Sequence, residues 1–378
     1  MSDQSFLRRH RELRWLVPVT LVGVAVVAVA VVAVHQTDHD LPQTSSAKLA
    51  ASVRAARDTG YSGTVSTEVS VDIPLELRTA VASLGRTPAP ALLLDGSHTL
   101  RFWYGGTKRQ RIELVRPDSE YDLFRTGSDV WQWDSGSRVA VHTTIANSQI
   151  PWPLSLSTPS ALTPTALARR MLAMLGSDTS TTIQDGPRVA DRSTYEMDLT
   201  PRDTQTRIAT VHIEVDGSTG VPLGVQIYAR GSSTPSVAVA FTSVVMSAPD
   251  TDDFRFTPPD DATVQDVGLP TAQYAIDTNR AAKTSGSSPA LVPTTAPKAS
   301  TGSDTTGSGW KAVATYETTP TAAKHATRGG SWTAVSGTWG SGRLDETPLI
   351  DTLVTSTGQV YVGAVEPSVL YSAAAGTR

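Results

Sequence analysis

The chain has 378 residues, of which 39% are hydrophobic and 18% are charged, and a chain of this length and composition allows about two or three folded domains. Its formal net charge of −4 gives no overall electrostatic basis for binding nucleic acid. Because the sequence contains no cysteine, disulfides, thiolate metal sites, cysteine nucleophiles and lipid attachment through a cysteine are excluded.

The first expected element is a membrane-spanning helix. Residues 15–34 read WLVPVTLVGVAVVAVAVVAV and contain no charged side chain, and roughly 20 apolar residues cross a bilayer. Arginines precede this run, whereas Asp38 and Asp40 follow it. This charge asymmetry predicts a single-pass protein of the cell membrane with a cytoplasmic N-terminus and the bulk of the chain extracytoplasmic. The expected ranges are a basic cytoplasmic N-terminus at 1–14, a transmembrane helix at 15–34 and a stalk at 35–44.

The same run has an alternative interpretation as a cleaved signal peptide. The sequence Ala28-Val29-Ala30 resembles a cleavage site made of small residues. The apolar core of a signal peptide is usually ~7–15 residues long, however, and this run is longer. Its length favours an anchor that stays attached to the chain.

Strands are expected over much of the next region. Residues 61–73 carry apolar side chains at odd positions and polar ones at even positions, which is typical of a strand with one dry face and one wet face. After an insertion at 74–95 the same alternation returns and predicts a meander of hairpins. Strands are predicted at 98–104, 108–115, through further turns to 142, and at 188–199, 206–215, 221–230 and 236–246.

Two helices are expected to cover the dry face of these strands. The segment 45–58 begins at Thr44 or Ser45, both good N-caps, and the segment 162–176 has Thr163 as its cap and Pro164 in its first turn. An apolar sheet face needs a cover. The predicted architecture is therefore α+β, a strongly curved antiparallel β-sheet covered by α-helices.

The C-terminal part changes in composition. Residues 269–308 include a long Ser/Thr/Pro/Gly/Ala-rich stretch that predicts a flexible linker. Beyond it, residues 309–378 predict a small α/β module with strands near Trp310 and Trp332, a short helix at 342–355, a strand at 359–365 and a terminal helix at 367–375. About 70 residues are marginal for independent folding, so we expect this module to dock on the main domain.

Two ordered sets of motifs resemble a known family. Residues 92–142 contain DGSHTLRFWYGGTKRQRIELV followed by DVWQWD, and residues 215–265 contain VDGSTGVPLGVQIYA followed by FRFTPPDDATVQ. Both sets resemble LolA-like and RseB-like proteins of the outer-membrane lipoprotein carrier superfamily. The C-terminal tail resembles membrane-anchored actinobacterial members of this group. The resemblance assigns residues 45–268 to one domain.

The resemblance implies an unclosed LolA-like half-barrel that holds helices over a hydrophobic cavity. It implies a non-enzymatic protein that binds lipid or lipoprotein acyl chains. The carrier members of the family move between two membranes, whereas the apolar run at 15–34 predicts a membrane-tethered protein here. The alternatives are an RseB-like regulatory or sensor protein that binds a membrane protein partner, and an accessory subunit of a transport system. No cofactor, metal, catalytic residue or nucleic-acid partner is expected, and the sequence contains no HExxH, GxSxG or P-loop motif.

The candidate cavity residues are aromatic and aliphatic side chains of the central strands, the second helix and the later hairpin. Large apolar side chains of this kind line ligand cavities, but they equally form an ordinary core. The methionines among them can adapt to acyl chains of different shape. The candidates are Phe102, Trp103, Tyr104, Ile112, Leu114, Trp131, Trp133, Leu167, Met171, Met174, Leu223, Val225 and Ile227.

Charged residues on the wet face of the same hairpin have two interpretations. Arg101, Arg109, Arg111 and Glu113 form either a rim for an anionic head group or a solvated cross-strand charge ladder. The sequence favours the ladder.

Overall fold

The computed structural model describes residues 41–56, 60–71, 95–106, 108–144, 163–266, 304–317, 319–328 and 331–376. The expected transmembrane helix at 15–34 and almost all of the expected insertion and linker lie outside these ranges. Within them, no helix is both long enough and apolar enough to cross a membrane.

The expected α+β class is wrong, because the described part of the chain is mostly β. Eighteen strands, β1–β18, contrast with four described α-helices. The helices are short: α2 spans Ser46–Ala55, α5 Pro164–Ala173, α7 Pro320–Ala326 and α8 Pro367–Gly376. Both predicted cover helices are present, but each has only ten residues, so the sheets dominate the architecture.

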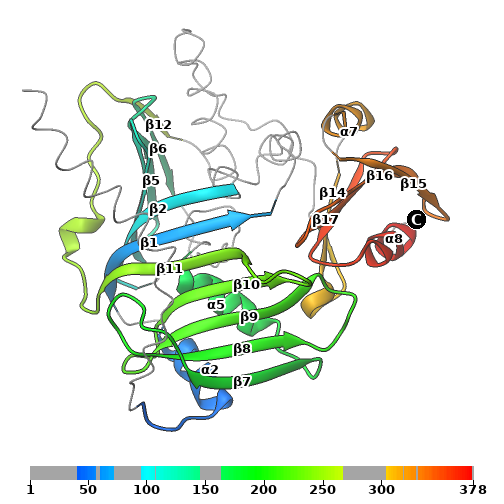
Figure 1. The fold of residues 1–378 in the computed structure, drawn as a ribbon. Coiled ribbons are helices and arrows are strands. Elements are labelled where there is room, and N and C mark those ends of the chain that lie inside the picture. The colour runs from blue at the N-terminus through cyan, green and yellow to red at the C-terminus, as the bar shows by residue number, and fades with distance from the viewer. Residues whose placement is uncertain are drawn as a thin grey trace, which may run out of the picture. The chain divides into compact units, whose positions relative to one another are not determined.

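Twelve strands form one open sheet in the order β12-β6-β5-β4-β3-β2-β1-β11-β10-β9-β8-β7 (Figure 1). All neighbours are antiparallel except β12, which runs parallel to β6. The order is linear and the sheet ends at β12 and β7, so the expected unclosed curved sheet is present. The bounds are β1 Tyr61–Ser70, β2 Asp95–Tyr104, β3 Arg109–Val115, β4 Glu120–Thr126, β5 Asp129–Asp134, β6 Val139–Thr144, β7 Thr179–Asp185, β8 Thr194–Pro201, β9 Ile208–Asp216, β10 Pro222–Ala229, β11 Pro235–Val245 and β12 Thr263–Asp266.

Strand β1 joins the two halves of this sheet, since it pairs with β2 on one side and β11 on the other. Its register with β11 shifts between Thr64 and Val65. Gly63 lies next to this irregularity, where an added Cβ would come within 2.2 Å of the Ser243 carbonyl oxygen. A glycine is therefore required for the two strands to approach each other here.

One apolar cluster lies on the inner face of the sheet and extends from β2, β3 and β6 to β8–β11. Helix α5 packs on β10 and β11, and α2 packs on α5 and β7 (Figure 1). The predicted caps are confirmed: the Ser45 hydroxyl accepts from the Lys48 N–H, and the Thr163 hydroxyl accepts from the Ala166 N–H. The capping residues therefore define where both helices begin, and the apolar sides of the helices complete the core.

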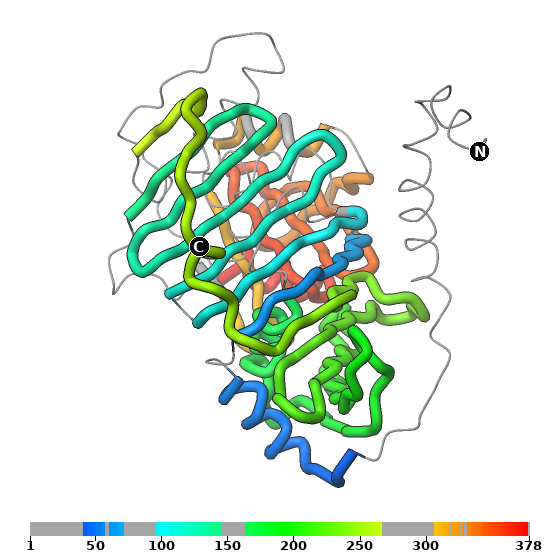
Figure 2. The backbone as a smooth tube through the Cα atoms, turned by 90° about the vertical axis from the view of Figure 1, so that its left-hand side faces the viewer, coloured from blue at the N-terminus to red at the C-terminus, as the bar shows by residue number. Residues whose placement is uncertain are grey.

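The outer face of the meander has a cover of its own. The segment that follows β11 crosses over β2–β6 (Figure 2). It includes the short 3₁₀-helix Thr251–Phe254, whose Phe254 carbonyl accepts a hydrogen bond from the Thr126 hydroxyl at 2.9 Å. The outer face of this half of the sheet is therefore partly covered.

The C-terminal module is an antiparallel sheet of six strands, ordered β13-β14-β18-β17-β16-β15. The expected small α/β module with a helix at 342–355 is wrong, because this segment forms most of β16 and β17. The spacing of Leu344 and Leu353 also fits those two paired strands, where both side chains are buried opposite each other. The bounds are β13 Asp304–Thr306, β14 Val313–Glu317, β15 Thr333–Gly337, β16 Gly340–Glu346, β17 Asp351–Thr355 and β18 Gln359–Gly363.

The two sheets belong to one compact unit, residues 41–378, and specific contacts join them. Thr206 forms an isolated bridge with Val365, and Trp310 is 3% exposed within the main apolar cluster. The Trp310 indole donates to the Thr179 hydroxyl at 2.7 Å. The module therefore docks on the main sheet, as the short length of its sequence predicted.

Candidate functional site

Ten of the thirteen predicted cavity residues meet in the main apolar cluster. All are buried except Met174, which is partly buried and packs against the others. These ten are Phe102, Tyr104, Ile112, Leu114, Leu167, Met171, Met174, Leu223, Val225 and Ile227. They come from β2, β3, α5 with its C-cap Met174, and β10, so the structure brings together segments more than one hundred residues apart in the sequence.

The three predicted tryptophans lie outside that cluster. Trp103 alternates with Phe102 and Tyr104 along β2, so it points to the opposite face. The guanidinium of Arg111 lies 4.5 Å from the Trp103 ring, and Phe256 lies 5.6 and 5.9 Å from the rings of Trp131 and Trp133. Trp131 and Trp133 thus pack against Phe256 of the crossing segment and Trp103 packs against Arg111, all on the outer face of the sheet.

Arg101, Arg111 and Glu113 form the predicted charge ladder on the same outer face, whereas the Arg109 guanidinium lies 6.0 Å from the centre of the Phe254 ring. Arg101 pairs with Glu113 at 2.6 Å across β2 and β3, and Arg111 pairs with Asp122 at 3.1 Å. Burial raises the pKa of Asp122 to about 6 although Arg111 lies beside it. These charges satisfy one another and face away from the apolar cluster, so they do not form a rim around it.

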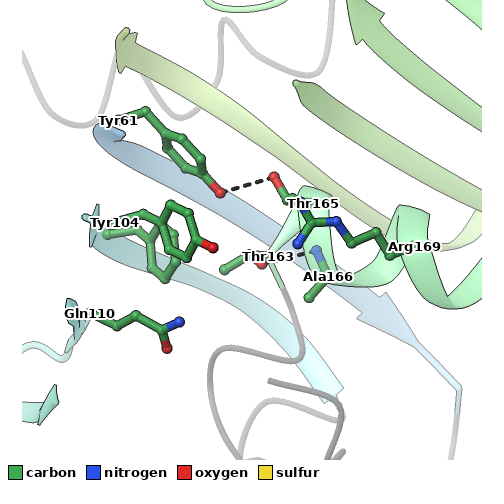
Figure 3. Close-up of a pocket in the computed structure, with 8 residues that line it drawn as sticks. Tyr61, Tyr104, Gln110, Thr163, Thr165, Ala166 and Arg169 are labelled. Carbon is green, nitrogen blue, oxygen red and sulfur yellow. Dashed lines mark hydrogen bonds between the residues drawn. The ribbon is translucent and has the colours of Figure 1, made fainter. Parts of the chain in front are cut away.

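A small cavity of about 20 Å³ lies where the first turns of α5 meet β1–β3 (Figure 3). The Tyr61 hydroxyl closes one side by donating to the Thr165 hydroxyl at 3.0 Å. Burial raises the pKa of Tyr61 well above its usual value, so this phenol stays protonated. The lining residues are Tyr61, Phe102, Tyr104, Gln110, Thr163, Thr165, Ala166 and Arg169.

The cavity contains polar atoms that lack partners. Nε and Nη2 of Arg169 are buried without a hydrogen-bond partner, and so is Oε1 of Gln110, a residue that is only 1% exposed. None of the eight described lining residues is acidic. Burying an unpaired guanidinium is costly, so this cavity is suited to an anionic or hydrogen-bonding guest.

Sequence reasoning missed Arg169, Gln110 and Thr165 as site residues. Thr165 and Arg169 are four positions apart in α5 and so lie on the same side of the helix (Figure 3). Polar residues at this spacing, beside the apolar stripe of Leu167 and Met171, were the signal available in the sequence. The sequence does not show that these two side chains lie against β1–β3, and this is known only from the fold.

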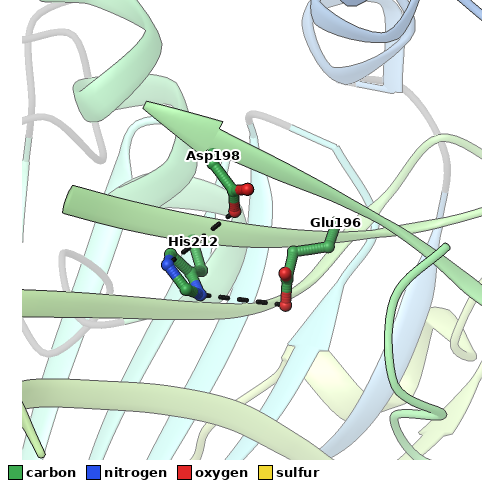
Figure 4. A group of neighbouring side chains, drawn as sticks. All are labelled: Glu196, Asp198 and His212. Atoms are coloured by element: carbon green, nitrogen blue, oxygen red, sulfur yellow. Dashed lines mark ion pairs between the residues drawn. The ribbon is translucent and has the colours of Figure 1, made fainter. Parts of the chain in front are cut away.

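A second side-chain cluster lies on the outer face of β8 and β9, which pair directly (Figure 4). The ligand-type atoms of Glu196, Asp198 and His212 lie within 4.8 Å of one another. His212 is 3.8 Å from each carboxylate, beyond hydrogen-bond range, while Gln184 and Thr182 donate to Glu196 and Asp198. The side chains are 13–27% exposed, and the carboxylates already have neutral donors, which is consistent with a solvated polar patch.

Comparison with known proteins gives matches in structure only. No protein-family model matches the sequence. No curated protein has significant sequence similarity to it.

The structure itself is similar to several solved structures. A chain in the complex of MucA and MucB from Pseudomonas aeruginosa has a TM-score of 0.42 and 15% identity, over 86% of this chain and 97% of that one. An uncharacterised conserved protein from Thermus thermophilus has a TM-score of 0.34 and 11% identity, over 59% and 99%. A LolA superfamily protein from Nitrosomonas europaea has a TM-score of 0.23 and 10% identity, over 57% and 99%.

These similar structures include MucB and a LolA superfamily protein, which are the groups that the sequence motifs resemble. At identities of 15% or less the similarity concerns the fold and not the ligand. The narrower resemblance to membrane-anchored actinobacterial members stays a prediction.

Proposed function

We propose that this protein is a non-enzymatic binder of an amphipathic ligand, a lipid or the acyl chain of a lipidated protein, between α5 and the inner face of the large sheet. The observation that carries the proposal is the continuous apolar face of an open sheet. That face extends from Leu100 and Ile112 to Leu223 and Val225, and each of these side chains is at most 1% exposed. Burial of apolar area is the main driving force for acyl-chain binding.

Binding requires α5 to move away from the sheet. The cavity of about 20 Å³ is far smaller than the ~300–1,000 Å³ of typical ligand pockets. Among the described residues at this end of α5, one side-chain hydrogen bond joins the helix to β1, from Tyr61 to Thr165. One neutral hydrogen bond contributes only about 1 kcal/mol net, so this polar contact adds little to the cost of opening. Most of the cost is exposure of the buried apolar side chains of α5, which a bound acyl chain would cover again.

We propose an extracytoplasmic location for the ligand-binding part of the chain. The uncharged run at 15–34 and the arginines before it support tethering to a membrane with the later residues outside the cytoplasm. In such a location the ligand can come directly from the membrane surface.

A second candidate function is that of a regulator that binds a membrane protein through the C-terminal module. Strand β15 lies at the edge of its sheet and is mostly exposed. It lines a groove of about 570 Å³ together with α7, β16 and β17, and Lys324 and Arg343 are its charged residues. An exposed edge strand can accept an extended segment of a partner. Recovery of such a partner by the full chain, but not by a chain ending at residue 303, would support this candidate.

The ligand can be identified directly. The full chain is purified from membranes in mild detergent, and the organic extract is analysed by mass spectrometry. We expect a defined lipid or acylated species at close to one equivalent. The matched variant Ala168→Trp places a large side chain in the fully buried contact between α5 and the sheet. This variant should lose the co-purifying lipid or acylated species. An extract with no lipid beyond the detergent-matched control would contradict the proposal.

A further inference from the structure

We propose that the cavity at the start of α5 binds the anionic group of the ligand, with the Arg169 guanidinium and the Gln110 amide as its recognition elements. The ligand is then an anionic amphiphile with a carboxylate or phosphate at one end. This inference rests on the proposed function, because it describes the polar end of the same site.

Arg169 differs from four other half-buried arginines in the described part of the chain. Arg111, Arg116, Arg192 and Arg207 have side chains 21–29% exposed, and each pairs with an aspartate. Arg169 is also partly buried, yet it forms no described ion pair, and its Nε and Nη2 have no hydrogen-bond partner. The described residues therefore supply Arg169 with no carboxylate partner, in contrast to those four arginines.

The two unpaired nitrogens form the edge of the guanidinium that holds two oxygens at once. Arg192 uses the same edge, since its Nε and Nη2 contact the two carboxylate oxygens of Asp216. A planar fork of this kind matches carboxylate and phosphate groups. The free edge of Arg169 thus presents the geometry that Arg192 already uses on a carboxylate.

The neighbours of Arg169 suit the junction between a head group and an acyl chain. Gln110 contributes a buried amide, and Tyr61 and Thr165 contribute hydroxyls on the opposite side (Figure 3). Phe102 also lines the cavity and belongs to the apolar cluster, so the polar space leads directly onto the apolar face. The present volume of about 20 Å³ holds one water-sized group, and the α5 movement required for the acyl chain also enlarges the space around the head group.

The test compares three probes that share one chain: dodecanoate, dodecyl phosphate and dodecanol. Binding to the full chain in detergent-free nanodiscs is measured by calorimetry. Charge-assisted hydrogen bonds contribute about ten-fold or more in affinity, so we expect both anions to bind at least ten-fold more tightly than dodecanol. Arg169→Gln should remove most of this preference and change the dodecanol affinity less than two-fold. Arg169→Lys, which keeps the charge but not the fork, should restore only part of it.

The control is Arg54→Gln, which changes an exposed arginine on α2 and should bind as the unchanged protein does. Ligand-free Arg169→Gln should melt at the same temperature or higher, because it removes an unpaired buried charge. A clearly lower melting temperature would assign Arg169 a structural role and overturn the inference.

The two proposals fail in different ways. If dodecanol binds but the anions have no advantage, or if Arg169→Gln keeps their advantage, the head-group inference is wrong and the proposed function stands. If inorganic phosphate competes as well as dodecyl phosphate, the site serves a free anion and the inference is wrong. If none of the three amphiphiles binds the unchanged chain, the proposed function fails as well.

Discussion

Arg207 donates two hydrogen bonds to the same oxygen of Asp351, from Nε at 3.2 Å and from Nη2 at 2.8 Å. Arg207 immediately precedes β9 of the large sheet, whereas Asp351 begins β17 of the C-terminal module. The backbone N–H of Arg207 also donates to the Ala364 carbonyl at 2.9 Å. One residue therefore joins the module to the main sheet through both its side chain and its backbone.

We expect Arg207→Ala to destabilise the protein by roughly 3–5 kcal/mol, because it leaves Asp351 buried without its partner. Asp351 is 0% exposed, so water cannot replace the lost guanidinium. The free energy of unfolding from urea titration measures the effect. The matched control is Arg255→Ala, whose pair with Asp252 is exposed and should contribute less than about 1 kcal/mol. Equal effects of the two substitutions would show that Arg207 does not hold the module in place.

A second prediction concerns Glu214, which is 1% exposed and whose Oε2 has no hydrogen-bond partner in the described structure. Burial, followed by the charge of Glu196, raises the pKa of Glu214 to about 8. A raised carboxyl pKa means that the folded state binds the proton more tightly than the unfolded state. The contribution of Glu214 to the free energy of unfolding is therefore fully present below about pH 4.5, and it is lost as the pH rises to about 8.

Glu214→Gln removes this titration. We expect the variant to exceed the unchanged protein at pH 9 by about 3–5 kcal/mol in free energy of unfolding, and the difference to shrink towards pH 5. Urea unfolding at several pH values measures it. If the free energies of unfolding of the two proteins differ by the same amount at every pH, Glu214 is ionised in the folded state and the prediction is wrong.

A third prediction concerns the turn between β9 and β10. Oδ1 of Asp216 accepts hydrogen bonds from the backbone N–H groups of Ser218 and Thr219 at 3.1 and 2.7 Å. Although burial opposes it, hydrogen bonding from Arg192, Thr219 and Ser218 lowers the pKa of Asp216 to about 2. The stability from Asp216 is then present above its unfolded pKa near 4 and is lost as the pH falls to about 2.

We expect Asp216→Ala to cost about 2–4 kcal/mol at pH 7, since it removes charge-assisted hydrogen bonds from a buried turn. Thermal unfolding at pH 7 and pH 2.5 measures the cost, which should be smaller at pH 2.5. Ser218→Ala, which leaves the carboxylate and its backbone donors in place, should cost less than half as much. A cost that does not change with pH would contradict the role of the carboxylate charge.

The turn also shows how far the sequence alone leads. Alternation placed Ile213, Val215, Leu223 and Val225 on one face, and all four are fully buried. It succeeded because a one-residue slip would expose every one of these side chains. The segment 342–355 was wrongly predicted as a helix, because its apolar spacing fits both a helix and two paired strands. Pairing with β15 and β18, the strands immediately before and after this segment, decides between them.

Only part of the candidate site could be predicted from the sequence, because residue type alone does not show which face of a strand or helix a side chain occupies. In Phe102-Trp103-Tyr104 every residue is aromatic, so residue type did not show which ring faces inward. Strand alternation separates Trp103 from its neighbours only once the structure shows that Phe102 and Tyr104 face the main apolar cluster. Arg169 carries no sequence motif, and its significance comes from the strand residues that α5 meets.

A fourth prediction concerns the opening of α5. Tyr61→Phe removes the hydrogen bond to Thr165 and leaves the ring in place. A loss of about 1 kcal/mol in the closed state should speed dodecanoate association about five-fold. Stopped-flow displacement of a fluorescent fatty acid measures the rate. Tyr195→Phe, on β8 away from the cavity, is the control and should leave the rate unchanged. An unchanged rate in Tyr61→Phe would show that this end of α5 does not open during binding.

The central claim is that an acyl chain lies between α5 and the inner face of the sheet. Photo-crosslinking with a dodecanoate that carries a diazirine near its methyl end, followed by peptide mapping of the full chain, tests it most directly. We predict crosslinks on α5 and on β2, β3 and β10, which excess dodecanoate suppresses. Crosslinks confined to the C-terminal module or to the outer face, around Trp131 and Phe256, would contradict the account.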